Sequence, residues 1–452
     1  MSRTLIQIGV ALSIVASPLT GQAIALERPF GTLREQARLQ QQWLEERLET
    51  VLPMLMREHG IEMWVVPMRE YNEDPVFRAL VSPTTFGARR RTIYVFHDRG
   101  PEHGVERLAL GGSSQGGVYE AVRGSVTTPD GRQQELWGYD QWEMFAEMVR
   151  ERNPSTIGVN ISREHAFADG LTAGEWEQMQ EVLGPDMLRR VRRAQLLPID
   201  YLATRIPDMQ PIMTKMVKLV HEIIATAFSN EVIIPGVTTT EDVVWWMRQR
   251  INDYGLTTWF QPSVSVQRHG GVPDTGPHSP VIQRGDVLHC DIGIIAFGLH
   301  TDTQHMGYVM RPGETEVPEG LKQALLNGNR LQDIAMEEMQ VGRTGDEALA
   351  ATVARMREAG IDGSIYTHPV GDHGHASGAI IGLWDRQDGV PERGDVPLRH
   401  NVYYAVELQA TTPVPEWGGQ RVRMGLEEDA EQTTEGPMRW LYKRQTEFHI
   451  VR

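Results

Sequence analysis

Four acidic residues and one histidine in the second half of the sequence have the types and positions of metal ligands. Asp291 interrupts the apolar run 287–292, and Glu407 ends the apolar run 402–407. A carboxylate in such a run is costly to bury unless a partner neutralises it or a cation binds it. The candidate ligands are Asp291, Asp302, His375, Glu407 and Glu427.

Turns and glycines can bring these residues together. Asp302 follows Asp291 beyond a turn at Gly298, so a hairpin would place the two carboxylates side by side. His375 lies in the glycine-rich segment 371–378, where the backbone can approach an ion closely.

Four converging carboxylates repel one another, and several would become protonated unless cations held them in place. Two divalent metal ions would cancel the four charges. Oxygen-rich ligation with one imidazole suits manganese, the favoured ion, and also zinc, cobalt or iron. A bridging water would lose a proton, and the resulting hydroxide could attack a carbonyl group that the ions polarise.

The elements that must position these ligands form a second α/β unit. Strands are expected at 260–266, 287–294, 306–310, 402–408 and 421–426, with helices at 212–228, 240–251, 321–338 and 346–359. A first unit has the pattern of a helix over 33–58, strands at 61–66, 91–96, 105–110 and 156–161, and further helices near 140–150 and 174–193. A hinge at 197–200, before Pro207 and Pro211, separates the two units.

The first 25 residues predict a signal peptide. Arg3 precedes the apolar run 5–16, and Ala23-Ile24-Ala25 fits a cleavage site. We expect a mature chain that begins near Leu26 and is periplasmic or secreted. Later apolar runs are too short to span a bilayer, so no stable membrane insertion is expected after signal removal.

The net charge and the cysteine content argue against a nucleic-acid partner and exclude an intrachain disulfide. The formal charge of −16 repels phosphate backbones, so nucleic acid is not expected as a partner. Cys290 is the only cysteine, which excludes an intrachain disulfide, and its apolar neighbours predict a buried strand residue.

In its ordered motifs the sequence resembles the pita-bread metallopeptidases, which include aminopeptidase P, prolidase, methionine aminopeptidase and creatinase. Segment 285–293 resembles the family's Gly-Asp, strand, Asp-x-Gly segment, and Asp302 falls where the second Asp is expected. The remaining matches are His375 with Gly378 as His-x-x-Gly, Glu407 at a strand end, and Glu427 before Gly436.

The resemblance implies an α/β (α+β) fold with a signal peptide (1–25), a creatinase-like N-terminal domain (26–197) and a pita-bread catalytic domain (198–452). It also implies two bound metal ions and a possible homodimer. His278 matches the family histidine that positions substrate. His368 and His373 flank the ligand loop and are either accessory catalytic residues or loop residues, and Glu428 supports a ligand or lies at the surface.

Three departures from the family concern the neighbours of ligands. Residues 303–305 replace the usual Arg after the second Asp, Leu408 follows Glu407 where Pro-Gly is usual, and Gly425-Leu426 precedes Glu427 where Arg-Ile is usual. The resemblance implies an Xaa-Pro aminopeptidase or prolidase type peptidase acting on short peptides. The alternatives are a creatinase-like amidinohydrolase and a catalytically silent binding protein on the same scaffold.

Overall fold

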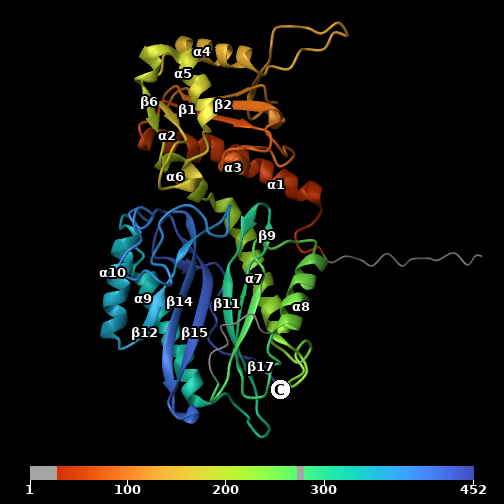
Figure 1. Ribbon diagram of the computed structural model, residues 1–452, viewed down its shortest axis with the longest axis vertical. Coiled ribbons are helices and arrows are strands. Elements are labelled where there is room, and N and C mark those ends of the chain that lie inside the picture. The colour runs from red at the N-terminus through yellow and green to blue at the C-terminus, as the bar shows by residue number, and fades with distance from the viewer. Residues whose placement is uncertain (1–27, 272–278) are drawn as a thin grey trace, which may run out of the picture.

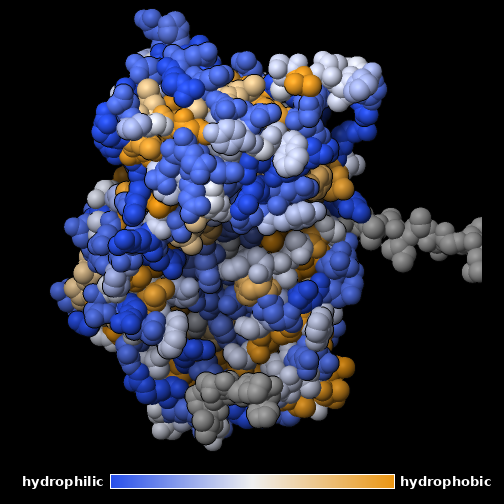
Figure 2. Space-filling model, turned by 45° about the horizontal axis from the view of Figure 1, so that its top comes forward, coloured by the Kyte–Doolittle hydropathy of each residue, from blue (hydrophilic) through white to orange (hydrophobic). Residues whose placement is uncertain are grey.

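The computed structural model describes residues 28–271 and 279–452. These residues form two domains, each a β-sheet flanked by helices, and the domains lie end to end (Figure 1). The expected signal peptide and His278 lie outside the described residues. Among the residues described, no helix is both long and apolar enough to cross a membrane. Hydrophilic residues cover most of the face drawn in Figure 2, and apolar residues occur there in scattered groups.

The N-terminal domain is built on a six-stranded sheet with helices on both faces. Its strand order is β4 (Glu120–Val122), β3 (Val105–Leu110), β2 (Arg91–Asp98), β1 (Met63–Arg69), β5 (Ile157–Val159) and β6 (Val191–Arg193). Helices α4 (Tyr139–Arg152) and α5 (Ala173–Leu188) cover one face, while α1 (Leu33–Glu46), a π turn (Arg47–Val51) and α2 (Leu52–Glu58) contribute to the core on the other. Alternation along β1 explains the two cores, since Met63 and Val65 pack on one face and Trp64 and Val66 on the other.

The C-terminal domain contains a nine-stranded sheet. The main path is β12 (Asp362–Ile365), β14 (Val402–Val414), β15 (Gln420–Gln432), β11 (Thr303–Val309), β8 (Val287–Ile292) and β7 (Ser263–Gln267). Three short strands extend it: β13 (His368–Val370), β16 (Arg439–Trp440) and β17 (His449–Val451). Cys290 is buried in β8, as predicted.

Two pairs of helices flank this sheet, α9 (Glu319–Glu338) with α10 (Gly345–Glu358) and α7 (Gln210–Ala227) with α8 (Thr240–Asp253) (Figure 1). Thr239 begins α8 and Thr344 begins α10, each as the N-cap of a capping box with Asp242 and Glu347. These helices agree closely with the sequence pattern.

The expected hinge is wrong in one respect, because residues 197–200 lie in helix α6 (Leu196–Ala203) and are buried. Pro198 is tolerated there because it stands in the first helical turn, where its missing N–H costs no hydrogen bond. The apolar side chains of α6 pack against the N-terminal sheet, with the Tyr201 and Trp64 ring centroids 6.0 Å apart. The segment is therefore packed between the two sheets.

Buried charges also join the two domains. Asp372, from the loop after β13, accepts from Arg205 at 2.9 Å and lies 3.5 Å from Arg47 of the N-terminal domain. Burial raises the pKa of Asp372, but Arg205 and Arg47 lower it more, so the net pKa is below its usual value. At the surface, Arg399 also pairs with the exposed Glu58 of α2 through two contacts of 2.6 Å.

We expect Asp372→Asn to destabilise the protein by about 3 kcal/mol, because it leaves two buried guanidinium groups without their carboxylate. The free energy of unfolding, measured with urea, checks this. Since the pKa of Asp372 is lowered by folding, the difference from the parent should be full above the ordinary Asp pKa of about 3.9 and shrink as the pH falls further.

The matched control is Asp362→Asn, which removes the carboxylate of an exposed pair with Arg421. Such a pair contributes at most about 1 kcal/mol. Equal stability losses in the two variants would show that the Asp372 cluster does not hold the domains together.

Candidate metal centre

Three of the predicted ligands lie in one row across four neighbouring strands. The register pairs Asp291 of β8 with Gln304 of β11, Gln304 with Glu427 of β15, and Glu427 with Glu407 of β14. Residues paired across a sheet project from the same face, so these side chains converge.

Asp302 joins the row from the residue before β11. The predicted hairpin is present as β9 (Ile295–Ala296) and β10 (Leu299–His300), and Gly298 takes the positive φ of 75° that the turn needs. One ligand atom each of Asp291, Asp302 and Glu427 lies within 4.8 Å of the others. A second group with the same spacing contains His368, Glu407 and Glu427.

Burial acts on all four carboxyl groups, and repulsion by neighbouring carboxylates acts on Asp302, Glu407 and Glu427. Burial raises the pKa of Asp291 to about 7 and that of Glu407 to about 8. The pKa values of Asp302 and Glu427 lie well above the usual range, first because both groups are buried and then because neighbouring carboxylates repel added charge. The four groups therefore require a positive partner to be ionised together.

Unsatisfied polar atoms show where a positive partner fits. Four buried atoms of the cluster have no hydrogen-bond partner among residues 28–271 and 279–452, namely Asp291 Oδ1, Asp302 Oδ1, Glu427 Oε1 and His368 Nε2. Buried polar groups in folded proteins are nearly always satisfied. Carboxylate oxygens with one imidazole nitrogen match the ligand preferences of manganese, iron, cobalt and zinc.

The structure places His368, not only His375, against the carboxylates. His368 Nδ1 donates to the Pro369 carbonyl at 3.0 Å, so Nε2 presents a lone pair 3.4 Å from Glu427 and 3.6 Å from Asp302. A lone pair facing carboxylate oxygens is repulsive unless a cation lies between them. The buried ring also has its pKa lowered to about 3, mainly by burial, which keeps it neutral.

His375 lies beside this group but at its exposed side. It shares a cluster with Asp302 and His368, and its Nε2 lies 3.4 Å from the Tyr366 hydroxyl. The Trp259 ring packs against it with centroids 5.1 Å apart, and Gly374 permits this because a Cβ there would lie 2.2 Å from Trp259.

The other predicted histidines have different positions. The His373 ring lies 4.7 Å from that of Phe167 and lines a hollow between the domains together with Arg47 and Asp372, so it is not part of the carboxylate cluster. His278 falls outside the described residues, and its role stays a prediction.

Sequence reasoning missed Gln304, which lies in the middle of the row. Its amide nitrogen donates to Glu407 Oε1 at 2.8 Å and to Glu427 Oε2 at 2.9 Å, while its oxygen lies 2.8 Å from His289 Nε2. Gly425 leaves room for the contact between the Gln304 and His289 side chains, since a Cβ at position 425 would lie 2.8 Å from His289. Two departures from the family pattern, Gln304 and Gly425, thus belong to one local arrangement.

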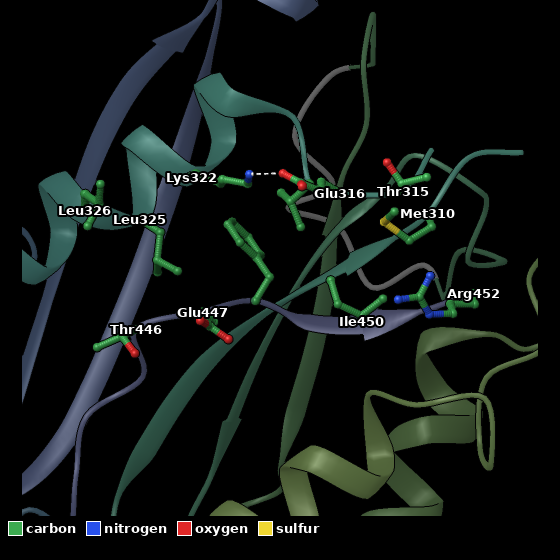
Figure 3. A pocket seen from close by; sticks show the side chains of 12 residues that line it. Met310, Thr315, Glu316, Lys322, Leu325, Leu326, Thr446, Glu447, Ile450 and Arg452 are labelled. Atoms are coloured by element: carbon green, nitrogen blue, oxygen red, sulfur yellow. Dashed lines mark hydrogen bonds and ion pairs between the residues drawn. The ribbon is translucent and has the colours of Figure 1, made fainter. Parts of the chain in front are cut away.

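A different hollow of about 450 Å³ lies between α9 and β17, where Leu325, Leu326 and Ile450 line it and Lys322 pairs with Glu316 at 2.7 Å (Figure 3). It shares no lining residue with the carboxylate cluster. Its apolar walls carry no comparable set of metal ligands.

The model of metallopeptidase family M24 matches residues 212–426, a range that contains Asp291, Asp302 and Glu407 and ends one residue before Glu427. Curated protein sequences give no match.

Solved structures share the fold over most of the chain. X-Pro aminopeptidase from Thermotoga maritima has a TM-score of 0.60 at 15% identity, covering 88% of this chain and 100% of that one. Xaa-Pro dipeptidase from Bacillus anthracis has 0.59 at 18%, covering 91% and 100%. The N-terminal domain of FACT complex subunit SPT16 from Cicer arietinum has 0.55 at 11%, covering 91% and 99%.

The fold and the carboxylate row define a metallohydrolase of the pita-bread class. The C-terminal domain belongs to metallopeptidase family M24, as the sequence resemblance predicted. The protein is accordingly a peptidase-family hydrolase that carries an additional N-terminal domain.

We expect Gln304→Met to lower metal affinity by a factor of about 10–100, because two ligand carboxylates lose the donor that orients them. Titration of metal-free protein by calorimetry measures this. Gln267→Met is the matched control, since Gln267 bonds to the backbone of Arg423 outside the row. Parent-like affinity in the Gln304 variant would contradict an orienting role.

Proposed function

We propose that the C-terminal domain is a two-metal peptidase that hydrolyses short peptides, with an Xaa-Pro bond as its favoured substrate. The observation that carries the proposal is the row of buried carboxyl groups with four unsatisfied polar atoms facing one another. The proposed ligands are Asp291, Asp302, His368, Glu407 and Glu427. His368 replaces His375 in the predicted set because of its buried, unprotonated Nε2.

Two divalent ions, manganese first among them, would supply an activated water nucleophile and polarise the peptide carbonyl. The chain's own residues then decide what can bind. Gln304 holds Glu407 and Glu427 in place, and His289 holds Gln304. Trp259, Tyr366 and His375 form a wall of aromatic rings beside the ligands and are placed to pack against a substrate side chain.

Positive charge near the site favours substrates with a free carboxyl end. Arg393 lowers the pKa of His375 and of His368, in each case after the larger effect of burial. A cation that acts on both rings can also attract the terminal carboxylate of a short peptide. This supports dipeptides and tripeptides over long chains as substrates.

The decisive experiment is digestion of a peptide panel after reconstitution with manganese, cobalt, zinc or iron. We expect chelator-sensitive cleavage, faster for Xaa-Pro than for Xaa-Ala peptides and faster for free carboxylates than for amides. A protein that binds two ions and cleaves no peptide would instead support a silent binding scaffold. Metal-independent turnover of a guanidino substrate would support a creatinase-like amidinohydrolase.

Two single substitutions distinguish the roles of the histidines. We expect His368→Ala to weaken metal binding by more than about 100-fold, a larger loss than that of a residue merely supporting a ligand. We expect His375→Ala to keep its metal and to lower kcat/KM, because the aromatic wall beside the ligands loses a ring contact of about 0.5–1.5 kcal/mol. Metal analysis and kinetics on the same preparations test both, and the reverse pattern would return His375 to the ligand set.

We also propose that the protein is exported. The support is the positive start, apolar run and small-residue exit within residues 1–25. N-terminal sequencing of the native protein should find Leu26 or a near neighbour first. An intact Met1 on cytoplasmic protein would refute export without affecting the proposed peptidase activity.

A further inference from the structure

Three histidines and one glutamate gather on the opposite face of the sheet from the carboxylate row. His305 follows Gln304 in β11 and Glu428 follows Glu427 in β15, so strand alternation directs both away from the row. His221 of α7 and His449 of β17 complete the group. His221, His305 and Glu428 are almost fully buried.

We propose that His221, His305 and Glu428 form an additional binding site for one divalent cation of the zinc type. His221 Nε2 lies 2.8 Å from Glu428 Oε2, and His305 Nε2 lies 2.9 Å from Glu428 Oε1. One ligand atom of each residue lies within 4.8 Å of the others. Ligands at bond lengths of about 2.0–2.2 Å on a tetrahedral ion stand about 3.3 Å apart, so each histidine needs to move from Glu428 by only a few tenths of an ångström.

The fourth histidine fits the role of a residue that orients a ligand. His305 Nδ1 lies 3.0 Å from His449 Nε2, and the two rings are stacked. When His305 Nε2 faces an ion, its Nδ1 carries the proton and donates to His449. Metal-bound histidines commonly donate their second ring N–H in this way.

The site has room for a fourth ligand. A hollow of about 360 Å³ is lined by His221, His305 and His449, together with Tyr442 and Gln445. Water can enter through it, which gives two histidines, one carboxylate and one open position. Zinc and cobalt readily accept this ligand set.

The basic side chains around the hollow are largely offset by acids. Lys218, Lys443 and Arg444 line it together with Glu222 and Glu447, Glu222 lies 3.9 Å from Lys218, and Arg444 pairs with Asp333. The competing interpretation is a closed network in which Glu428 accepts from His221, His305 and the backbone N–H of Gln445 at 2.7 Å. That network uses the same atoms and needs no ion.

Cobalt titration separates the two interpretations, because four-coordinate cobalt absorbs visible light much more strongly than cobalt with five or six ligands. The parent should bind one cobalt ion more than His221→Gln and show the strong absorption, which the variant should lack. His449→Gln should keep the ion with an affinity lower by a factor of about 10–100. His400→Gln, an exposed histidine bonded to the Thr433 carbonyl, is the matched control and should behave as the parent.

The comparison does not depend on the proposed peptidase site, because the expected difference of one ion remains whether the carboxylate row holds two ions or none. Circular dichroism and melting temperature of the metal-free proteins confirm that the variants are folded. His305→Gln provides a second loss of a ligand if His221→Gln does not fold. Equal cobalt content and equal spectra in the parent and a folded ligand variant would overturn the proposal.

Discussion

Repulsion among four buried carboxyl groups is the constraint on which the C-terminal domain depends. Three of them occupy one cross-strand row, and Asp302 is brought to it by a hairpin. Their pKa values are raised by burial and by one another, so the arrangement is stable in its ionised form only with positive charge among the oxygens. The long pairing of β14 with β15, from Val402 with Gln432 to Val414 with Gln420, holds the row in register against this repulsion.

Two departures from the family pattern, Gln304 and Gly425, belong to one set of contacts around the ligands. Where the family usually has Arg before the last ligand segment, Gly425 leaves space into which His289 can extend. His289 fixes the Gln304 amide, and that amide donates to two ligand carboxylates at once. A neutral donor thus orients the ligands without adding charge, and the balance between carboxylates and cations is left to the ions alone.

The sequence predicted much of the fold and four of the five proposed ligands. Acidic residues inside strand-like runs are visible in the sequence because burial of a lone carboxylate is costly, and the Gly298 turn indicated how Asp302 returns. Register could not be predicted, because it depends on pairing between strands distant in the chain. For the same reason the role of Gln304 could not be predicted. The choice between the two histidines could not be predicted either, because His368 with Gly371 has the same His-x-x-Gly spacing as His375 with Gly378. The segment 197–200 resembled a hinge because prolines surround it, whereas packing between the sheets makes it helical.

Strand alternation links the two faces of the sheet. Gln304 and Glu427 belong to the carboxylate row, while their successors His305 and Glu428 belong to the histidine cluster. A shift of register by one residue would exchange the two sets, so both faces specify the same pairing. The histidine cluster connects α7, β11 and β15 on the face opposite the carboxylate row. These contacts hold the backbone of β11 and β15 in place against the repulsion among the carboxylates. The row can be held close enough to bind ions because the reverse face of the same strands is itself locked by polar contacts.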